Sequence, residues 1–452
     1  MQHASRLALL SLSALTALTA ACGSAPEGGV EACPTVLGAP IVHPQTIAQS
    51  ETWSAANVHV VQGDTSVMEG VTLTIDPCAQ VVFRQNASLT LGRTGRGAPA
   101  QLIAEGTAQR PIHFSGENGV RWGEIFVQHP ARATLRHAHF THGGADRFHQ
   151  HATLSLRGDG LTPAKPVALL DHVTVEDSLG SGVVAERTAT FAPGSRDLVI
   201  TRTGHGGVNP YPLRIHEHAI DALPTGRYTG NQVDEILLDP AGANGTGGLQ
   251  EDATLRDRGV PYRVGSSSVD RFSIGAGGQN APRQTTLTIE PGVVMRFAPG
   301  TRLAVEHYTG EFAASGVLRA VGTAERPIVM TSAAATPRPG DWGGVWYGGI
   351  ASPQNRLEHV TLAYTGYDCG CVLSTCSDVP DHDAAVIFSQ PPTADFIHRV
   401  RFVHGHGHGV FRGWRGAATP DYTADNVFEN MGGCAQTLPM LPDGCGARRA
   451  CR

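Results

Sequence analysis

Short apolar segments separated by Gly, Pro, Asn or Asp make up most of the chain from Val58 onward. Hydrophobic and polar residues alternate within them, as in residues 73–75 (LTI) and 89–91 (LTL), which turns one face of a strand inward and the other to solvent. No long apolar pattern with a helical period intervenes. A spacing of about ten residues between strands leaves no room for crossover helices. The pattern therefore predicts an all-β fold, with strands that are either antiparallel or wound into a parallel β-helix.

A second copy of this pattern follows the first. Residues 73–83 (LTIDPCAQVVF) return as residues 287–297 (LTIEPGVVMRF), and two further motifs follow each copy in the same order. Such short β segments cannot bury their apolar faces alone, so repeats of them stack into a solenoid with a continuous core. The sequence therefore predicts two tandem modules of one architecture. The further pairs are residues 102–112 with 318–328 and residues 122–125 with 342–345.

These motifs resemble bacterial right-handed parallel β-helix repeat proteins of the cell surface, which have the pectate-lyase-like superfold. The likeness covers about residues 53–432, and residues 229–231 (TGN) and 260–264 (VPYRV) resemble the passage from one such module to the next. It implies a right-handed parallel β-helix for the whole of this region. It assigns no activity, because many of these proteins have none. The first copy departs from the second at Cys78 and Glu124, where the second copy has glycine.

Turn-forming residues at 241–248 (AGANGTGG) predict the boundary between the two modules. Ordered structure is expected to begin near Trp53. The predicted parts are a signal peptide (1–21), a lipidated cysteine with a flexible tether (22–52), β-helix module 1 (53–248), β-helix module 2 (249–433) and a cysteine-rich C-terminal tail (434–452).

The N-terminus combines Arg6, an apolar run at residues 7–18 and the small residues Thr19-Ala-Ala before Cys22. The run is too short for a spanning helix and is typical of a signal peptide. Small residues directly before a cysteine resemble the bacterial lipobox, although Thr19 replaces the usual Leu. The resemblance implies acylation of Cys22, with chains such as palmitate, and a membrane anchor on the outer membrane or cell surface of a Gram-negative bacterium. The alternative is an ordinary secretory signal cleaved near the preceding alanines.

The chain has nine cysteines, and setting Cys22 aside leaves an even number, eight. The protein is expected in an oxidising compartment, where cysteines form disulfides. Four disulfides are predicted. Cys33 is expected to pair with Cys78, because these are the two cysteines of the N-terminal part. The last six allow fifteen pairings, and a zinc site that includes His382 is the rival interpretation of three of them. These six are Cys369, Cys371, Cys376, Cys434, Cys445 and Cys451.

Composition supports a folded, turn-rich β protein. The 452 residues include 55 Gly and 29 Pro but only 5 Trp, and Gly plus Pro stays below the roughly 25–30% that marks low complexity. The net charge is −6, and Lys165 is the one lysine among 34 basic residues. Arginine is scattered without a basic face, so nucleic-acid binding is not expected.

Histidines at 404, 406 and 408 alternate with glycine. In an extended strand the three imidazoles would lie on one face, as metal ligands could. The favoured interpretation is a glycine corner like residues 204–206 (GHG), because no carboxylate or cysteine accompanies the run at ligand spacing. No metal or cofactor is therefore predicted.

Acidic residues follow the cysteine cluster at Asp378, Asp381 and Asp383, with His382 among them. Closely set carboxylates could bind Ca²⁺ or work as an acid and base pair. The favoured interpretation is a solvated loop held by disulfides, because the stretch lacks a glycine-templated calcium loop.

Tryptophans at 122 and 342 occupy equivalent places in the two copies, which indicates a packing role. Trp346, Tyr347 and Trp414 have no counterpart and are candidates for an outward platform that stacks on sugar rings. Isolated surface aromatics without a ligand are the alternative.

The leading hypothesis is a non-catalytic lipoprotein of the cell envelope that displays a rigid β-helical rod and contacts polysaccharide or another envelope protein. No catalytic residue is assigned, since the chain has no Gly-x-Ser-x-Gly elbow between a strand and a helix. The alternative is a polysaccharide lyase or hydrolase of pectate-lyase-like architecture. The fold by itself does not favour this enzyme over a binding protein, because one fold serves many functions. A groove lined by two carboxylates and a basic residue would favour the enzyme.

Overall fold

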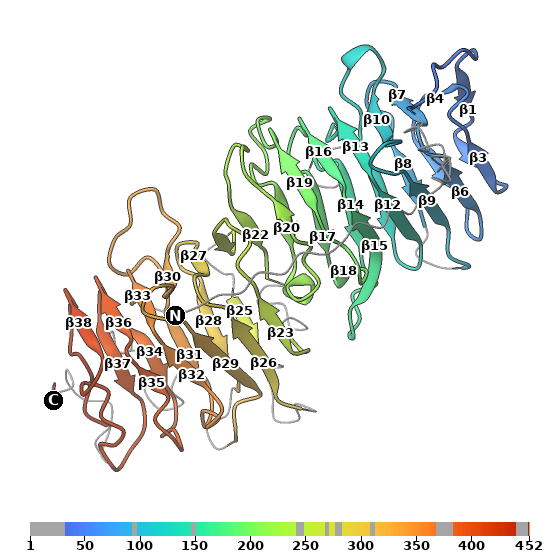
Figure 1. Cartoon of the computed structure of the whole chain (residues 1–452). Coiled ribbons are helices and arrows are strands. Elements are labelled where there is room, and N and C mark those ends of the chain that lie inside the picture. Colours follow the sequence, from blue (N-terminus) through green and yellow to red (C-terminus); the bar gives the residue numbers. More distant parts are fainter. Residues whose placement is uncertain are drawn as a thin grey trace, which may run out of the picture.

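A computed structural model of the chain describes residues 32–92, 97–145, 151–240, 248–266, 271–275, 283–307, 312–367, 383–439 and 451. Its strands form five sheets, in which neighbouring strands are parallel. Figure 1 shows a rod in which the strands succeed one another in sequence order along the axis. The predicted all-β parallel β-helix is confirmed. The helical elements of the described residues are two single turns, η1 (Glu117–Gly119) and η2 (Glu217–Ala219).

Sheet B runs the full length of the rod, and sheet A accompanies it through the first copy. Sheet A comprises β1 (Ile41–His43), β4 (Val58–Val61), β7 (Gln80–Phe83), β10 (Ile112–Gly116), β13 (Ala138–Thr141), β16 (Thr174–Glu176), β19 (Leu198–Thr201) and β21 (Gly226–Arg227). Sheet B comprises β2 (Thr46–Ile47), β5 (Thr65–Val67), β8 (Leu89–Leu91), β11 (Ile125–Gln128), β14 (Leu154–Arg157), β17 (Val183–Glu186), β20 (Leu213–Ile215), β22 (Ile236–Leu238), β24 (Tyr262–Val264), β27 (Val294–Phe297), β30 (Ile328–Ser332), β33 (Val360–Ala363), β36 (Arg401–Val403) and β38 (Val427–Glu429).

Three shorter sheets complete the coil, sheet C in the first copy and sheets D and E in the second. Sheet C comprises β3 (Glu51–Trp53), β6 (Thr72–Ile75), β9 (Gln101–Glu105), β12 (Arg132–Arg136), β15 (Lys165–Asp171) and β18 (Ala189–Phe191). Sheet D comprises β25 (Arg271–Ile274), β28 (Arg302–Val305), β31 (Val345–Tyr347), β34 (Ala384–Phe388) and β37 (His408–Arg412). Sheet E comprises β23 (Ala253–Leu255), β26 (Thr285–Ile289), β29 (Gly316–Val321), β32 (Arg356–Glu358) and β35 (Ile397–His398).

Alternation along each strand builds the core. Leu73 and Ile75 on β6 point inward and stack on Leu102 and Ala104 of the next coil, in register. Tight corners between strands use single residues with left-handed backbone, such as His137 (φ 43°) between β12 and β13. Outside glycine, Asn, Asp and His are the residues most enriched in this conformation.

Repeated tryptophans pack in the same way in both copies. The Trp122 ring stacks on Phe83 with centroids 4.2 Å apart, and the Trp342 ring stacks on Phe297 at 4.0 Å. Each indole Nε1 donates to a carbonyl of the following coil, Thr141 at 2.7 Å and Ala363 at 2.8 Å. Both rings are fully buried, so the predicted packing role is confirmed.

The second copy enters the coil shifted by one sheet. Strand β7 belongs to sheet A, but β27, its equivalent in the repeated motif, belongs to sheet B. In the same way β11, which follows Trp122, lies in sheet B, whereas β31, which follows Trp342, lies in sheet D. Sheet B is continuous across the change through β20, β22 and β24. The two copies therefore form one rod.

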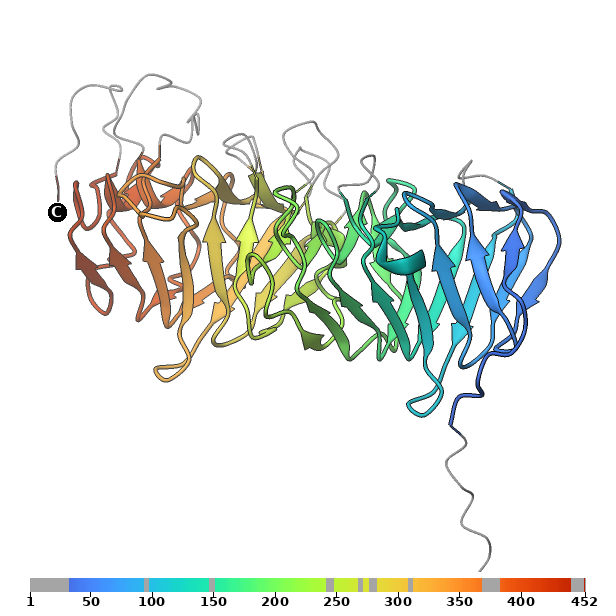
Figure 2. The ribbon, with the colours of Figure 1, turned by 90° about the horizontal axis from the view of Figure 1, so that it is seen from above.

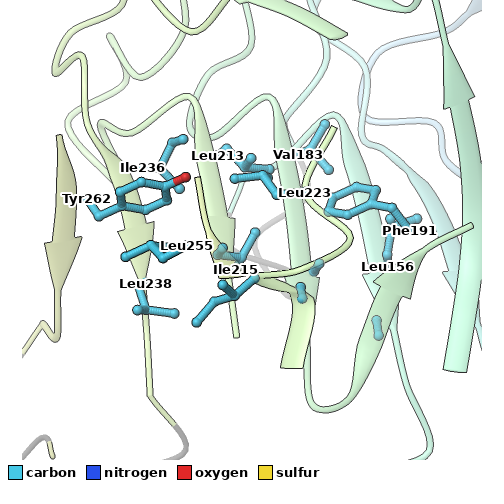
Figure 3. Close-up of a cluster of buried hydrophobic side chains, with 14 of the residues drawn as sticks. Leu156, Val183, Phe191, Leu213, Ile215, Leu223, Ile236, Leu238, Leu255 and Tyr262 are labelled. Atoms are coloured by element: carbon cyan, nitrogen blue, oxygen red, sulfur yellow. The ribbon is translucent and has the colours of Figure 1, made fainter. Parts of the chain in front are cut away.

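The junction coil, residues 211–240 and 248–265, makes this shift possible. Turn η2 contacts β18 at the end of sheet C, where a further sheet strand would otherwise follow. Figure 3 shows side chains from strands on both sides of the junction meeting in one apolar cluster. Its members include Val183, Phe191, Leu213, Ile236, Leu255 and Tyr262, all buried.

Ordered structure begins earlier than predicted. Strand β1 starts at Ile41, within the segment expected to be a flexible tether. The reason is a polar and aromatic cap at the end of the rod, in which the His43 ring stacks on Trp53 with centroids 4.0 Å apart and its Nε2 lies 2.9 Å from His59 Nδ1. These contacts join β1 to β3 and β4.

Disulfides tie down both ends of the described chain. Cys33 is bonded to Cys78, as predicted, and Cys434 is bonded to Cys451. The positive φ of Cys78 (73°) matches that of Gly292 (88°) at the equivalent place in the second copy. The other predicted disulfide cysteines, Cys369, Cys371, Cys376 and Cys445, lie outside the described residues, as does Cys22.

Candidate functional site

The predicted aromatic platform does not reach the surface. Trp346 is 5% exposed, Trp414 is 3% exposed and Tyr347 is fully buried. Trp346 Nε1 donates to Ser389 Oγ at 3.0 Å, and Trp414 Nε1 donates to the Ala417 carbonyl at 2.9 Å. Tyr347 belongs to the core because alternation along β31 turns it inward beside Val345. The prediction that these rings stack on sugars is therefore wrong.

Of the predicted acidic cluster, Asp378 and Asp381 lie outside the described residues. Asp383 is half-buried just before β34, and its carbonyl accepts a hydrogen bond from the backbone N–H of His408 at 2.7 Å. The solvated loop held by disulfides stays the favoured prediction for this stretch, with calcium binding or acid–base chemistry as the alternatives.

Histidines of the Gly-His run do not converge. His404 has left-handed backbone (φ 56°) at a corner and stacks on Tyr364 with centroids 5.3 Å apart. His408 Nδ1 instead accepts a hydrogen bond from the backbone N–H of Cys434 at 2.8 Å, and His406 is exposed. His404 therefore lies at a corner, as the favoured interpretation predicts, whereas His408 begins strand β37.

One surface ladder gathers acidic residues and histidine at the corner between sheets C and A. Asp171 is 3% exposed and accepts hydrogen bonds from His172 Nδ1 at 2.7 Å, from Arg196 Nε at 3.0 Å and from Arg136. Burial acts to raise the pKa of Asp171, but these hydrogen bonds prevail and lower it. A carboxylate bound by two guanidinium groups stabilises the corner and has little capacity left for a ligand.

The junction coil brings a second set of charged residues to the outer face of sheet B. Arg214 on β20, Leu237 on β22, Arg263 on β24 and Arg296 on β27 occupy one row, in register. Their strand neighbours point into the core, so this row faces outward. Adjacent strands are about 4.8 Å apart, which sets three guanidinium groups along one short stretch of the rod.

Two carboxylates lie within this row. Glu235 is 4% exposed, and its Oε2 lies 3.7 Å from Arg263 Nη1 while its Oε1 pairs with Arg296. Asp239 accepts from Arg214 Nε at 3.0 Å. The surface of the row therefore carries three cations against two anions.

Tyr211 packs beneath this row. The guanidinium carbon of Arg263 lies 5.8 Å from the centre of the Tyr211 ring, within cation–π range. Burial raises the pKa of the Tyr211 hydroxyl, against the opposing effect of Arg263. The phenol is thus neutral and keeps its proton. We call Tyr211, Arg214, Arg263 and Arg296 the arginine row.

Turn η2 places His216, Glu217 and His218 next to the arginine row. One ligand atom from each of the three side chains lies within 4.8 Å of the other two. Glu217 Oε2 is 3.2 Å from His216 Nδ1, and Glu217 Oε1 accepts the backbone N–H of Gly248 at 3.0 Å. Burial lowers the pKa of His216 to about 4, against the opposing charge of Asp239. Burial also lowers the pKa of His218.

Sequence reasoning did not find the junction residues. The spacing of His216 and His218 equals that of the Gly-His run, so the same signal was present. The arginine row has no local signal, because its three arginines come from three strands spread over residues 214–296 and Tyr211 precedes the first of these strands. Among the described residues, no helix is long and apolar enough to cross a membrane.

Part of the second copy matches a known protein family. Residues 277–368 match the family described as the pectate-lyase-like beta helix domain. The match spans β26 to β33 and agrees with the parallel coil seen there. Neither the curated proteins nor the solved structures include a match to the chain.

Proposed function

We propose that this protein is a non-catalytic lipoprotein of the bacterial envelope, whose rod binds an anionic polysaccharide through the arginine row. The observation that carries the proposal is the excess of guanidinium groups on the outer face of sheet B at the junction. Guanidinium groups bind sugar carboxylates or sulfates through paired hydrogen bonds.

A binding role suits these residues better than lyase chemistry. A lyase of this architecture would need carboxylates free to hold calcium beside a basic group. Glu235 is buried and engaged by two arginines, and Asp239 is engaged by Arg214. Both carboxylates thus orient the guanidinium groups and are not available as calcium ligands.

The N-terminal disulfide supports attachment at one end of the rod. Cys33 is fixed to Cys78 in the first coils, and ten residues lie between it and the expected lipidated Cys22. Even a fully extended segment of that length spans at most about 40 Å. An acylated Cys22 would hold this end of the rod near the membrane, with the junction further out along the axis (Figure 2).

Binding to immobilised polygalacturonate, with neutral dextran as the comparison, tests the proposal. The Cys22→Ser chain should bind polygalacturonate in a salt-dependent manner, since exposed charges are screened by salt. Arg263→Ala and Arg296→Ala should each weaken binding at least about tenfold, the effect of losing one good charged contact. Arg319→Ala is the matched control, because Arg319 is an exposed arginine on sheet E.

Three results would overturn the proposal. These are no retention of the unaltered chain, equal loss of binding in Arg319→Ala, or release of unsaturated uronate products. The last result would establish the enzyme instead.

A further inference from the structure

We propose that His216, Glu217 and His218 form a binding site for one transition-metal ion of the zinc class, which joins the two copies at the junction. The proposal stands apart from polysaccharide binding and concerns a different set of side chains. It rests on the geometry of turn η2 and on two buried imidazole nitrogens.

The turn brings three consecutive side chains to one side. In a strand, Glu217 would point away from both histidines, because successive side chains alternate. Residues 217–219 instead form a single helical turn, and one ligand atom of each residue lies within 4.8 Å of the others. Two atoms that each lie about 2.1 Å from a tetrahedral zinc ion are about 3.4 Å apart. The 3.2 Å between His216 Nδ1 and Glu217 Oε2 fits that spacing.

Buried nitrogens without hydrogen bonds supply the independent observation. His218 is 9% exposed, and its Nδ1 is buried and makes no hydrogen bond. His216 Nδ1 is likewise buried and without a hydrogen bond, although it lies close to the Glu217 carboxylate. Buried polar atoms are normally satisfied, and an imidazole nitrogen left bare is one that a metal can bind.

The donor set selects the class of metal. Two imidazoles and one carboxylate suit zinc and its neighbours, whereas calcium and magnesium take oxygen ligands almost throughout. The corner ladder offers a similar composition in Asp171, His172 and Asp197, but Arg136 and Arg196 already occupy Asp171. Within the part of the chain that the structure describes, the η2 group is therefore the better metal site.

The position of the site indicates a structural role. Glu217 Oε1 accepts the N–H of Gly248, which lies just before the first strand of sheet E. Glu251 on the same segment acts electrostatically on His218. An ion held by η2 would fix the Glu217 carboxylate, and through it the start of the second copy, at the coil where the sheets change place.

Calorimetric titration of the full chain with zinc tests the proposal. The protein carries no affinity tag, is freed of metal by EDTA and is kept under non-reducing conditions. We expect one Zn²⁺ per chain and a thermal unfolding midpoint that rises on adding zinc. His218→Gln and Glu217→Gln should each weaken zinc binding at least about tenfold, because loss of even an outer-shell partner has an effect of that size. His406→Gln, which alters an exposed histidine of the Gly-His run, should bind zinc like the unaltered chain.

Circular dichroism of each variant shows whether it folds, and Glu217→Gln keeps the side-chain volume in case His218→Gln does not fold. The proposal is overturned by less than one zinc per chain, by unchanged affinity in the folded Glu217→Gln or His218→Gln variant, or by loss of binding in His406→Gln. Retained stoichiometry with a loss confined to the two junction variants supports it.

Discussion

Inward side chains such as Ile289 hold each coil to the next. Ile289 is 1% exposed and lies opposite Ala320 of the following coil, as Ile75 lies opposite Ala104 in the first copy. Because the interior is closely packed, removing a branched side chain leaves a cavity that the neighbours fill only in part. Stability is therefore carried by residues that repeat from copy to copy.

Ile289→Ala should lower the free energy of unfolding by about 2–5 kcal/mol. Trp414→Ala should cost about 3–5 kcal/mol, because Trp414 is 3% exposed and packs edge-on against Phe388. This reverses the expectation for an outward Trp414. Val321→Ala, at a position that is 37% exposed, should change stability by less than about 0.5 kcal/mol. Denaturant unfolding gives all three values, and an unaltered midpoint for Ile289→Ala would contradict the inward assignment.

A single side chain, that of Cys22, is expected to decide whether the protein is attached to a membrane. We predict that Cys22→Ser leaves folding unchanged and releases the protein from membranes, because the acyl chains supply the anchoring free energy. Fractionation with mass spectrometry of the mature N-terminus measures this. A serine variant that still sediments with membranes and bears acyl chains would show that another residue carries the anchor.

The cap at the N-terminal end of the rod depends on the pairing of strands as well as on single residues. His43 and His59 are buried between β1 and β4, share one hydrogen bond and flank the Trp53 ring. His59 Nε2 lies 2.8 Å from the carbonyl oxygen of Ser54. Burial lowers the pKa of both imidazoles from 6.5, and their mutual repulsion adds to this for His43. Glu51 opposes both shifts, and Asp76 opposes that of His59.

The cap should therefore weaken in acid. Above about pH 6.5 both histidines are neutral in the folded and unfolded chain, and the contacts are intact. As the pH falls below 6.5, the unfolded chain takes up protons that the folded cap resists, so stability is lost down to the lowered pKa values. The double variant His43→Gln/His59→Gln should show a smaller loss in unfolding midpoint between about pH 7.5 and about pH 5.5.

Exposed His406 provides the control for this comparison, because other histidines with a lowered pKa, such as His113, add the same background to every variant. His406→Gln should keep the pH dependence of the unaltered chain. An identical pH dependence in the double variant would show that the cap is not the sensitive element.

At the scale of the whole molecule, cross-links complement a core that is long and thin. We predict that the mature protein contains no free thiol, because eight cysteines remain after Cys22 and two pairs are bonded in the structure. The loop between Cys33 and Cys78 spans 45 residues, for which chain entropy suggests about 4 kcal/mol of stabilisation. Thiol titration of the denatured, unreduced protein is the measurement. Two or more reactive thiols per chain would indicate a metal or redox site among residues 369–376.

The continuity of sheet B is a property of the whole molecule that no single sequence motif predicts. Equivalent motifs predict equivalent strands, and the local packing of Trp122 and Trp342 agrees with this. Which sheet a strand joins depends on the coil beneath it, and the junction coil sets that through η2 and β22. The η2 histidines, Tyr211, Arg214 and Arg263 all belong to this coil, and Arg296 follows on β27.

Sequence alone determined the strands and the inward residues, because alternation is a local property and repetition shows that neighbours stack. The spacing left antiparallel and parallel strands open, and the parallel coil followed from the resemblance of the repeated motifs to β-helix repeat proteins. The sequence also determined the pairing of Cys33 with Cys78, since few partners were present. The sequence could not place Trp346 and Trp414, because burial of an outer side chain depends on what packs over it. It could not assemble Arg214, Arg263 and Arg296 either, because strand pairing brings distant residues into one row. Tertiary structure alone decided the candidate sites, since a site is defined by distances in space and the sequence records only distances along the chain.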